Sequence, residues 1–276
     1  MTKGTAMGAL EIGVVPAGVD DRCVEVGDLS LRVLRKGQGP SLVYLHDSLG
    51  NIGWLPLFED LASSFDVIVP DLPGFGASQC PMWARSTRDI AIVVAQLLAR
   101  LEIVDITLVG TGFGGWIAAE LATMNPRLLR QLVLIGAAGI KPRAGEIADQ
   151  MLRGALRYGL GGFRDAASFR RVFGIAEEEV DDVPDALYQL WDLSTEMTAR
   201  VCWKPWMFSL ELPQLLRGVT VPTLVVWGAD DQLFPVDIGH QYVEQLPDAR
   251  LAIVDDAGHW IELEQPEVLA GLIRGQ

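Results

Sequence analysis

The sequence predicts an α/β protein with a mostly parallel central sheet and helices on both faces of that sheet. Short apolar runs rich in β-branched residues, typical of buried parallel strands, recur at 41–45, 66–69, 106–109, 132–135, 223–227 and 251–254. Amphipathic helical patterns separate most of these runs. Because strands that alternate with helices pack as a sheet covered on both sides, the order of the elements predicts the architecture.

The elements at the start of the fold follow a different pattern. Residues 22–26 and 29–34 alternate in polarity around a Gly-Asp pair, which predicts a β-hairpin with a tight turn. The first two strands of the sheet are therefore expected to pair antiparallel. Further along, an apolar stripe over 90–101 indicates a helix, and Ser86 and Asp89 are typical of its cap and its first turn.

The alternation of strands and helices stops over 141–218, where only helix-like patterns occur. The simplest interpretation is a helical cap inserted after the sixth strand, with a core formed by 1–140 and 219–276. The insertion carries an aromatic cluster that includes Trp191 and Trp206. Two interpretations stay open for this cluster: packing within the cap, or the wall of an apolar pocket.

Composition and charge exclude several classes of function. A net charge of −14 without a long basic run opposes binding to nucleic acid or to an anionic membrane surface. No stretch approaches the roughly 18 apolar residues that cross a bilayer, and no signal peptide is indicated. The three cysteines form no C-x-x-C pair and the three histidines lack metal-ligand spacing. We therefore expect a cytoplasmic protein that acts on a small molecule without a metal or cofactor, in an oligomeric state that the sequence leaves open.

Gly112 is the most informative residue of the chain. Residues 106–120 read as an apolar strand, a glycine-rich turn and an apolar-periodic helix. This is the pattern of a nucleophile elbow, G-x-S-x-G, in which a serine stands on a sharp strand-to-helix turn. Here the turn is kept, but glycine takes the place of the serine.

Four further segments accompany the elbow in a fixed order along the chain. They are Leu-His-Asp-Ser at 45–48, Asp-Leu-Pro-Gly-Phe-Gly-Ala-Ser at 71–78, Trp-Gly-Ala-Asp-Asp-Gln-Leu-Phe-Pro at 227–235 and Asp-Ala-Gly-His at 256–259. With these motifs the chain from residue 42 onward resembles the α/β-hydrolase-fold proteins, close to carbon–carbon bond hydrolases, esterases and haloperoxidase-like members. The resemblance implies an α/β-hydrolase core with a lid over the site.

The resemblance also implies roles for individual residues. His259 corresponds to the catalytic base and Asp231 to the acid that orients its imidazole. Asp230 is the rival acid, but the spacing of Asp231 from the neighbouring glycine and proline fits the family pattern better. The oxyanion hole of this fold uses two backbone amides, which correspond to those of Phe113 and Ser48.

Two positions depart from the family pattern. Gly112 removes the atom that would form an acyl-enzyme, and it also relieves backbone strain, because glycine adopts a positive φ freely. Asp47 stands where the family usually has the glycine of a His-Gly motif, beside the expected pocket and next to His46. Its carboxylate either orients water or raises the pKa of His259, or it is a loop aspartate that binds its own backbone.

A substitute nucleophile is not expected elsewhere. Thr111 should point sideways from the turn, Ser48 has no evident base, and Cys202 is expected to be a small core residue of the insertion. The glycines at 110, 112 and 115 also satisfy a dinucleotide-binding fingerprint. That interpretation is disfavoured because the next strand ends without the acidic residue that would hold a ribose, and because it leaves the His259 motif unexplained.

Three hypotheses for the function follow. The leading one is an enzyme that uses His259 and Asp231 as a general acid–base pair on a small, partly apolar carbonyl substrate, with lytic, rearranging or water-mediated hydrolytic chemistry. Hydroxynitrile lyases and cofactor-independent dioxygenases of this fold work by proton abstraction of that kind. The second is a pseudo-hydrolase that binds a ligand without converting it. The third is an ordinary serine hydrolase, an esterase or carbon–carbon hydrolase, whose nucleophile was replaced by Gly112.

Overall fold

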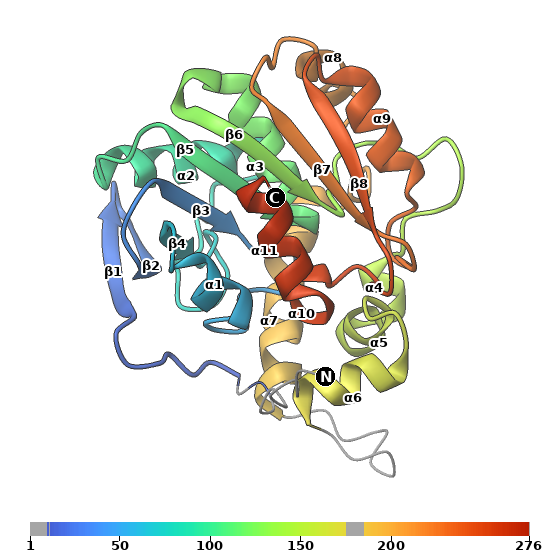
Figure 1. Cartoon of the computed structure of the whole chain (residues 1–276), viewed down its shortest axis with the longest axis horizontal. Coiled ribbons are helices and arrows are strands. Elements are labelled where there is room, and N and C mark those ends of the chain that lie inside the picture. The colour runs from blue at the N-terminus through green and yellow to red at the C-terminus, as the bar shows by residue number, and fades with distance from the viewer. Residues whose placement is uncertain (1–9, 11, 175–184, 276) are drawn as a thin grey trace.

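The predicted fold class is confirmed in a computed structural model of the chain, which describes residues 10, 12–174 and 185–275. An eight-stranded sheet in the order β1-β2-β4-β3-β5-β6-β7-β8 crosses the described part of the molecule (Figure 1). Its strands are β1 (Asp20–Val26), β2 (Leu29–Lys36), β3 (Ser41–Leu45), β4 (Asp66–Pro70), β5 (Ile106–Thr111), β6 (Leu129–Ile135), β7 (Thr223–Gly228) and β8 (Ala249–Val254).

The pairing of the strands brings distant parts of the sequence together at one edge. β1 and β2 form the expected antiparallel hairpin, β2 also pairs antiparallel with β4, and the remaining neighbours are parallel. In the register of β3 and β5, Leu45 lies beside Gly110. The loops that follow these two strands therefore start side by side, at the carboxyl edge where ligands bind in open α/β sheets.

Helices cover both faces of the sheet. They are α1 (Pro56–Leu61), α2 (Thr87–Arg100), α3 (Gly112–Met124), α4 (Gln150–Arg153), α5 (Ala155–Gly161), α6 (Ala166–Phe173), α7 (Asp185–Cys202), α8 (Leu212–Leu216), α9 (Asp237–Gln245), α10 (Ile261–Glu264) and α11 (Pro266–Arg274), with a short 3-10 turn at Pro126–Leu128. α1 packs against α11 on one face, whereas α2, α3, α8 and α9 contact one another in succession on the other. The pattern agrees with the alternation seen in the sequence.

Helix α2 illustrates how local sequence determines an element. The Ser86 hydroxyl accepts a hydrogen bond from the Asp89 amide, and the Asp89 carboxylate accepts one from the Ser86 amide, which is a complete capping box. The expected apolar stripe, including Ile90, Val94 and Leu97, is buried. Burial of this face fixes α2 against α3, the helix that follows the elbow.

The segment between β6 and β7 contains the helices α4 to α8 and, in the described residues, an isolated β-bridge from Gly139 to Phe208. In Figure 1, α4, α5, α6 and α7 lie on the side of the sheet toward which the parallel strands point. The helical content agrees with the expected insertion. The division into a core of 1–140 and 219–276 and a lid of 141–218 stays a prediction.

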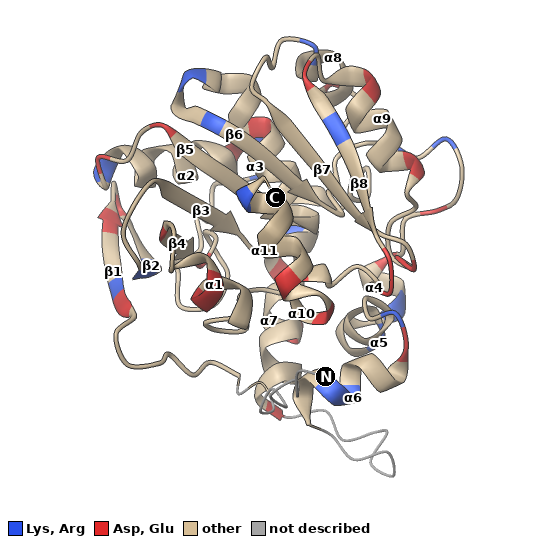
Figure 2. Ribbon diagram, in the orientation of Figure 1, with Lys and Arg blue, Asp and Glu red and all other residues tan. Residues whose placement is uncertain are grey.

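Charged residues are distributed over many elements, and Figure 2 shows the Lys and Arg residues scattered along outer helices, strands and loops. Within the described residues, no helix is both long enough and apolar enough to cross a membrane.

Candidate active site

The elbow between β5 and α3 has the geometry that a nucleophile elbow requires. Gly112 adopts a φ of +52°, in the left-handed region that glycine tolerates without a Cβ penalty. Gly114, one residue beyond Phe113, lies so close to β3 that a Cβ there would stand 2.3 Å from the Leu45 carbonyl oxygen. The turn is therefore held tightly against the end of β3.

His259 and Asp231 are brought together by the loops that follow β8 and β7. The imidazole Nδ1–H of His259 donates to Asp231 Oδ2 over 2.8 Å, and both side chains are buried. The other oxygen, Asp231 Oδ1, accepts the backbone amides of Leu233 and Phe234, which fixes the orientation of the carboxylate. Asp230, the rival acid, lies 3.3 Å from Arg164 on the surface instead.

The loop that carries His259 is anchored to α5 and to its own short helix. The His259 amide donates to the Gly162 carbonyl over 2.7 Å, and the Trp260 indole donates to the Gly159 carbonyl. The Glu264 carboxylate accepts the Gly258 amide over 2.7 Å. These bonds hold the imidazole in place at the carboxyl edge of the sheet.

The second ring nitrogen of His259 is buried and has no hydrogen-bond partner among the described residues. Burial opposes the charged form of the ring, but the charge and hydrogen bond of Asp231, with the charges of Asp47 and Glu262, outweigh it and raise the pKa of His259 to about 9. The imidazole is therefore protonated at neutral pH.

Asp47 fills the space that a nucleophile side chain would take. Its Oδ1 accepts the backbone amide of Phe113 over 2.6 Å, and a Cβ built on Gly112 would lie only 1.9 Å from the same oxygen. Its Oδ2 lies 3.9 Å from His259 Nε2. Because the Phe113 amide is engaged by Asp47, binding of a substrate oxygen there stays a prediction and requires Asp47 to move aside.

His46 and Ser48 flank Asp47 and support it. Leu72 donates its amide to His46 Nε2, so the proton is on Nδ1, which donates to the Asp47 carbonyl over 2.7 Å. Burial lowers the pKa of His46, consistent with this neutral ring. The Ser48 hydroxyl donates to Asp47 Oδ2 over 3.3 Å. His46 thus fixes the loop after β3, and both neighbours help to place the Asp47 carboxylate.

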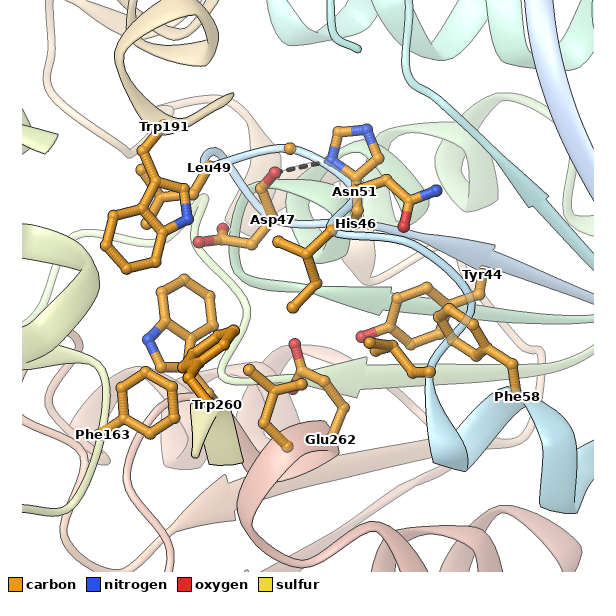
Figure 3. A pocket seen from close by; sticks show the side chains of 15 residues that line it. Tyr44, His46, Asp47, Leu49, Asn51, Phe58, Phe163, Trp191, Trp260 and Glu262 are labelled. Atoms are coloured by element: carbon orange, nitrogen blue, oxygen red, sulfur yellow. Dashed lines mark hydrogen bonds between the residues drawn. The ribbon is translucent and has the colours of Figure 1, made fainter. Parts of the chain in front are cut away.

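A small cavity of about 40 Å³ opens beside Asp47. Its walls combine residues of the loop after β3 with residues of the segment between β6 and β7, as Figure 3 shows for Asp47, for Trp191 on α7 and for Phe163 in the loop after α5. A water molecule needs roughly 10–15 Å³ measured in this way, so the space holds a few waters and a larger ligand requires the walls to shift. Trp206 is not part of the walls, because its indole donates to the Ala148 carbonyl elsewhere in the insertion.

Glu262, on α10, is a site residue that the sequence reasoning missed. It lines the cavity, and its Oε2 is buried without a hydrogen-bond partner among the described residues. Burial raises its pKa to about 7, against the lowering effect of the His259 charge. The Tyr44 hydroxyl also acts to lower the pKa of Glu262. The sequence feature that could have identified Glu262 is its place three positions after His259, as an acidic residue within an apolar stretch.

The groups considered as substitute nucleophiles are engaged elsewhere. The Thr111 hydroxyl is hydrogen-bonded to the Tyr44 hydroxyl over 2.6 Å. Cys202 is buried and donates to the Thr198 carbonyl, and burial raises the pKa of its thiol. Across the described ranges, no group of three His, Cys, Asp or Glu side chains is arranged to hold a metal ion. The expectation that no cofactor is needed stays a prediction.

Comparison with known proteins identifies the family. Residues 40–266 match the model of the alpha/beta hydrolase fold. The chain belongs to the α/β-hydrolase-fold family. The resemblance expected from the five motifs is thereby confirmed.

Individual relatives are hydrolases. The chain is 30% identical to 2-hydroxymuconate semialdehyde hydrolase of Pseudomonas sp. (strain CF600), over 86% of each chain. It is 25% identical to 2-hydroxy-6-oxononadienedioate/2-hydroxy-6-oxononatrienedioate hydrolase of Cupriavidus pinatubonensis, over 91% of this chain and 92% of the relative. The structure of 2-hydroxy-6-oxo-6-phenylhexa-2,4-dienoate hydrolase from Rhodococcus sp. strain RHA1 superimposes with a TM-score of 0.73 at 22% identity, covering 93% and 98% of the two chains.

Proposed function

We propose that this α/β-hydrolase-fold protein is an enzyme that acts on a small, partly apolar carbonyl compound by proton transfer, without an acyl-enzyme. One observation carries the proposal: His259 Nε2 is buried and unpartnered among the described residues, 3.9 Å from Oδ2 of the cavity residue Asp47, while Nδ1 is held by Asp231. A ring fixed in this way leaves one nitrogen without a protein partner and therefore available for proton exchange. Gly112 offers no atom for covalent attack.

The charges around the cavity favour an uncharged substrate. Two carboxyl groups, those of Asp47 and Glu262, line it, and the lining contains no Lys or Arg among the described residues. The Cupriavidus relative is named for a dioate, a doubly acidic compound. The nearest cation, the His259 imidazolium, is already paired with Asp231, so an anion between Asp47 and Glu262 would find little compensating charge. We therefore expect a substrate that is less acidic than that compound.

The raised pKa of His259 supports a role as the acid in the reaction. With a pKa of about 9, the ring is an imidazolium at neutral pH and serves as the acid that protonates a leaving atom. Activity is then expected to fall as the pH rises through about 9, since the proton to be donated is lost. This decrease, the alkaline limb of the pH profile, is measured from kcat/KM as a function of pH.

The test uses three uncharged compounds that cover the hydrolytic and lytic possibilities: 4-nitrophenyl acetate, mandelonitrile and 1-phenyl-1,3-butanedione. We expect turnover of at least one, lost in His259→Ala but kept in the matched control His240→Ala, because His240 is exposed on α9. Mass spectrometry of the protein during turnover should detect no covalent adduct. Turnover that survives His259→Ala, or an acylated residue, would overturn the proposal.

A second candidate, a ligand-binding protein without turnover, is favoured by one observation. The Asp47 carboxylate is bound to the Phe113 amide, the group on which a hydrolase would bind the developing oxyanion. Return of a bound compound unchanged, with no turnover of the three compounds, would support this candidate. The replaced-serine hypothesis requires Asp47 in another position, because a Cβ on Gly112 would lie 1.9 Å from its Oδ1.

A further inference from the structure

We propose that Asp47 is a catalytic residue that takes over the proton-accepting role at the place of the missing nucleophile. Its Oδ2 and His259 Nε2 hold one O–H group between them, supplied by water or by a substrate hydroxyl. Asp47 accepts the proton of that group while His259 donates its own to the leaving atom. The proposal rests on the proton-transfer function given above. It adds Asp47 as the proton acceptor beside the proton donor His259.

The first argument is the position of the carboxylate. A side chain at residue 112 would begin 1.9 Å from Asp47 Oδ1 and 3.0 Å from His259 Nε2. The carboxylate of Asp47 therefore lies in the volume that a nucleophile at the elbow would use, within the reach of the same histidine. The missing serine and the unusual aspartate are two parts of one arrangement.

The second argument is orientation. Oδ1 is tied to the Phe113 amide, which leaves Oδ2 as the oxygen nearest to His259, at 3.9 Å from Nε2. That gap is too long for a direct hydrogen bond. An oxygen atom about 2.8 Å from both atoms would bond to them at an angle of roughly 90°. Because Nε2 is buried and His259 does not line the cavity, the neighbouring side chains must open to admit that atom. The Ser48 hydroxyl, 3.3 Å from Oδ2, steadies the carboxylate.

The third argument is chemical balance. The O–H bond breaks, its proton moves to Asp47 Oδ2, and its electron pair forms either a new bond from water to the carbonyl carbon or the C=O bond of a product. The bond to the leaving atom breaks, and that atom keeps the electron pair and takes the proton of His259 Nε2. The proton on Asp47 then returns to His259 across the space vacated by the product. No oxidant, reductant or cofactor is needed.

The principal test compares Asp47→Asn with Asp230→Asn. The asparagine has the same shape but accepts no proton, and Asp230 is an aspartate outside the cavity that pairs with Arg164. With the fastest of the three uncharged compounds, Asp47→Asn is expected to lower kcat at least about 100-fold while KM changes little. The Asp47 charge also raises the pKa of His259, so the alkaline limb of the profile should move to lower pH in this variant. Asp230→Asn should keep the wild-type rate.

Rescue separates a chemical role from a structural one. Asp47→Gly opens a space for formate, and added formate should restore part of the lost rate in this variant but none in Asp47→Asn. A histidine NMR titration should show the pKa of His259 lowered in Asp47→Gly and raised again by formate, which gives a readout besides activity. Mandelonitrile supplies its own hydroxyl, whereas hydrolysis of 4-nitrophenyl acetate or the diketone requires water, so the active compound identifies the source of the O–H group.

The outcomes distinguish the two proposals. A wild-type rate in Asp47→Asn, with the rate lost in His259→Ala, would overturn the role of Asp47 and leave the proposed function intact. Wild-type rates in both variants would overturn both. A low rate in Asp47→Asn with no formate rescue in a folded Asp47→Gly would reduce Asp47 to a positioning residue and overturn the inference.

Discussion

A side chain at position 112 and the carboxylate of Asp47 cannot occupy the same space. Substitutions at the two positions should therefore have non-additive effects on the free energy of unfolding. In Gly112→Ala the new Cβ would stand 1.9 Å from Asp47 Oδ1 and 2.5 Å from its carboxyl carbon, so the carboxylate must move and give up its bond to the Phe113 amide. A hydrogen bond to a charged group contributes about 1.5–3 kcal/mol. Holding alanine at a φ of +52° costs about 1–2 kcal/mol more. The single variant should therefore lose about 2.5–5 kcal/mol.

In an Asp47→Ala background the same substitution meets no carboxylate, so the backbone cost of about 1–2 kcal/mol is left. The close approach of the new Cβ to His259 Nε2, at 3.0 Å, is common to both backgrounds and cancels in the comparison. The difference is a coupling of about 2 kcal/mol between the two positions. Urea unfolding of the wild type, both single variants and the double variant completes the cycle, with the midpoint and slope fitted for each. Additive losses, with a coupling below about 0.5 kcal/mol, would refute the placement of Asp47 against residue 112.

Two further predictions concern the partners of His259. Asp231→Asn should lower kcat by about 10⁴-fold, because the amide no longer orients the ring or stabilises its charged form. Asp230→Asn should stay near the wild-type rate. Steady-state kinetics of both variants provide the comparison, and equal effects would contradict the assignment. Glu262, whose pKa burial raises from 4.5 to about 7, binds its proton more tightly in the folded protein, so its contribution to stability is full below pH 4.5 and is lost as the pH rises through 7. The loss of stability amounts to about 3 kcal/mol. Urea unfolding midpoints measured between pH 4.5 and 7 should fall in the wild type but stay nearly level in Glu262→Gln. If the midpoints of both proteins changed in parallel with pH, Glu262 would not be buried as described.

Much of the fold follows from local sequence. The hairpin of β1 and β2, the six parallel strands and the cap of α2 are each determined by alternation, by apolar runs or by a capping box, which act within a few residues of the chain. The meeting of His259 with Asp231 also follows, because parallel strands end at one edge and the loops after β7 and β8 start there together.

Contacts between side chains from different loops were not predictable in the same way. The sequence allowed Asp47 to bind its own backbone or to face the site, and the choice depends on the loop after β3 meeting the first turn of α3. The sequence placed Trp191 and Trp206 in one aromatic cluster, yet only Trp191 lines the cavity. The packing of the helices decides which of the two indoles faces inward. Glu262 was missed because its place in the cavity wall depends on how the short helix α10 packs after His259.

The close approach of residues 47 and 112 also restricts the order in which such a site can arise. In the present geometry an aspartate carboxylate at 47 and any side chain at 112 would claim the same volume, since a Cβ on Gly112 would stand 1.9 Å from Asp47 Oδ1. A lineage that starts from a serine elbow must therefore lose the serine before the carboxylate can settle in its place. The reverse change has the same restriction, because Asp47 must be substituted before a serine at position 112 can be accommodated. Each state is thus protected against single substitutions toward the other.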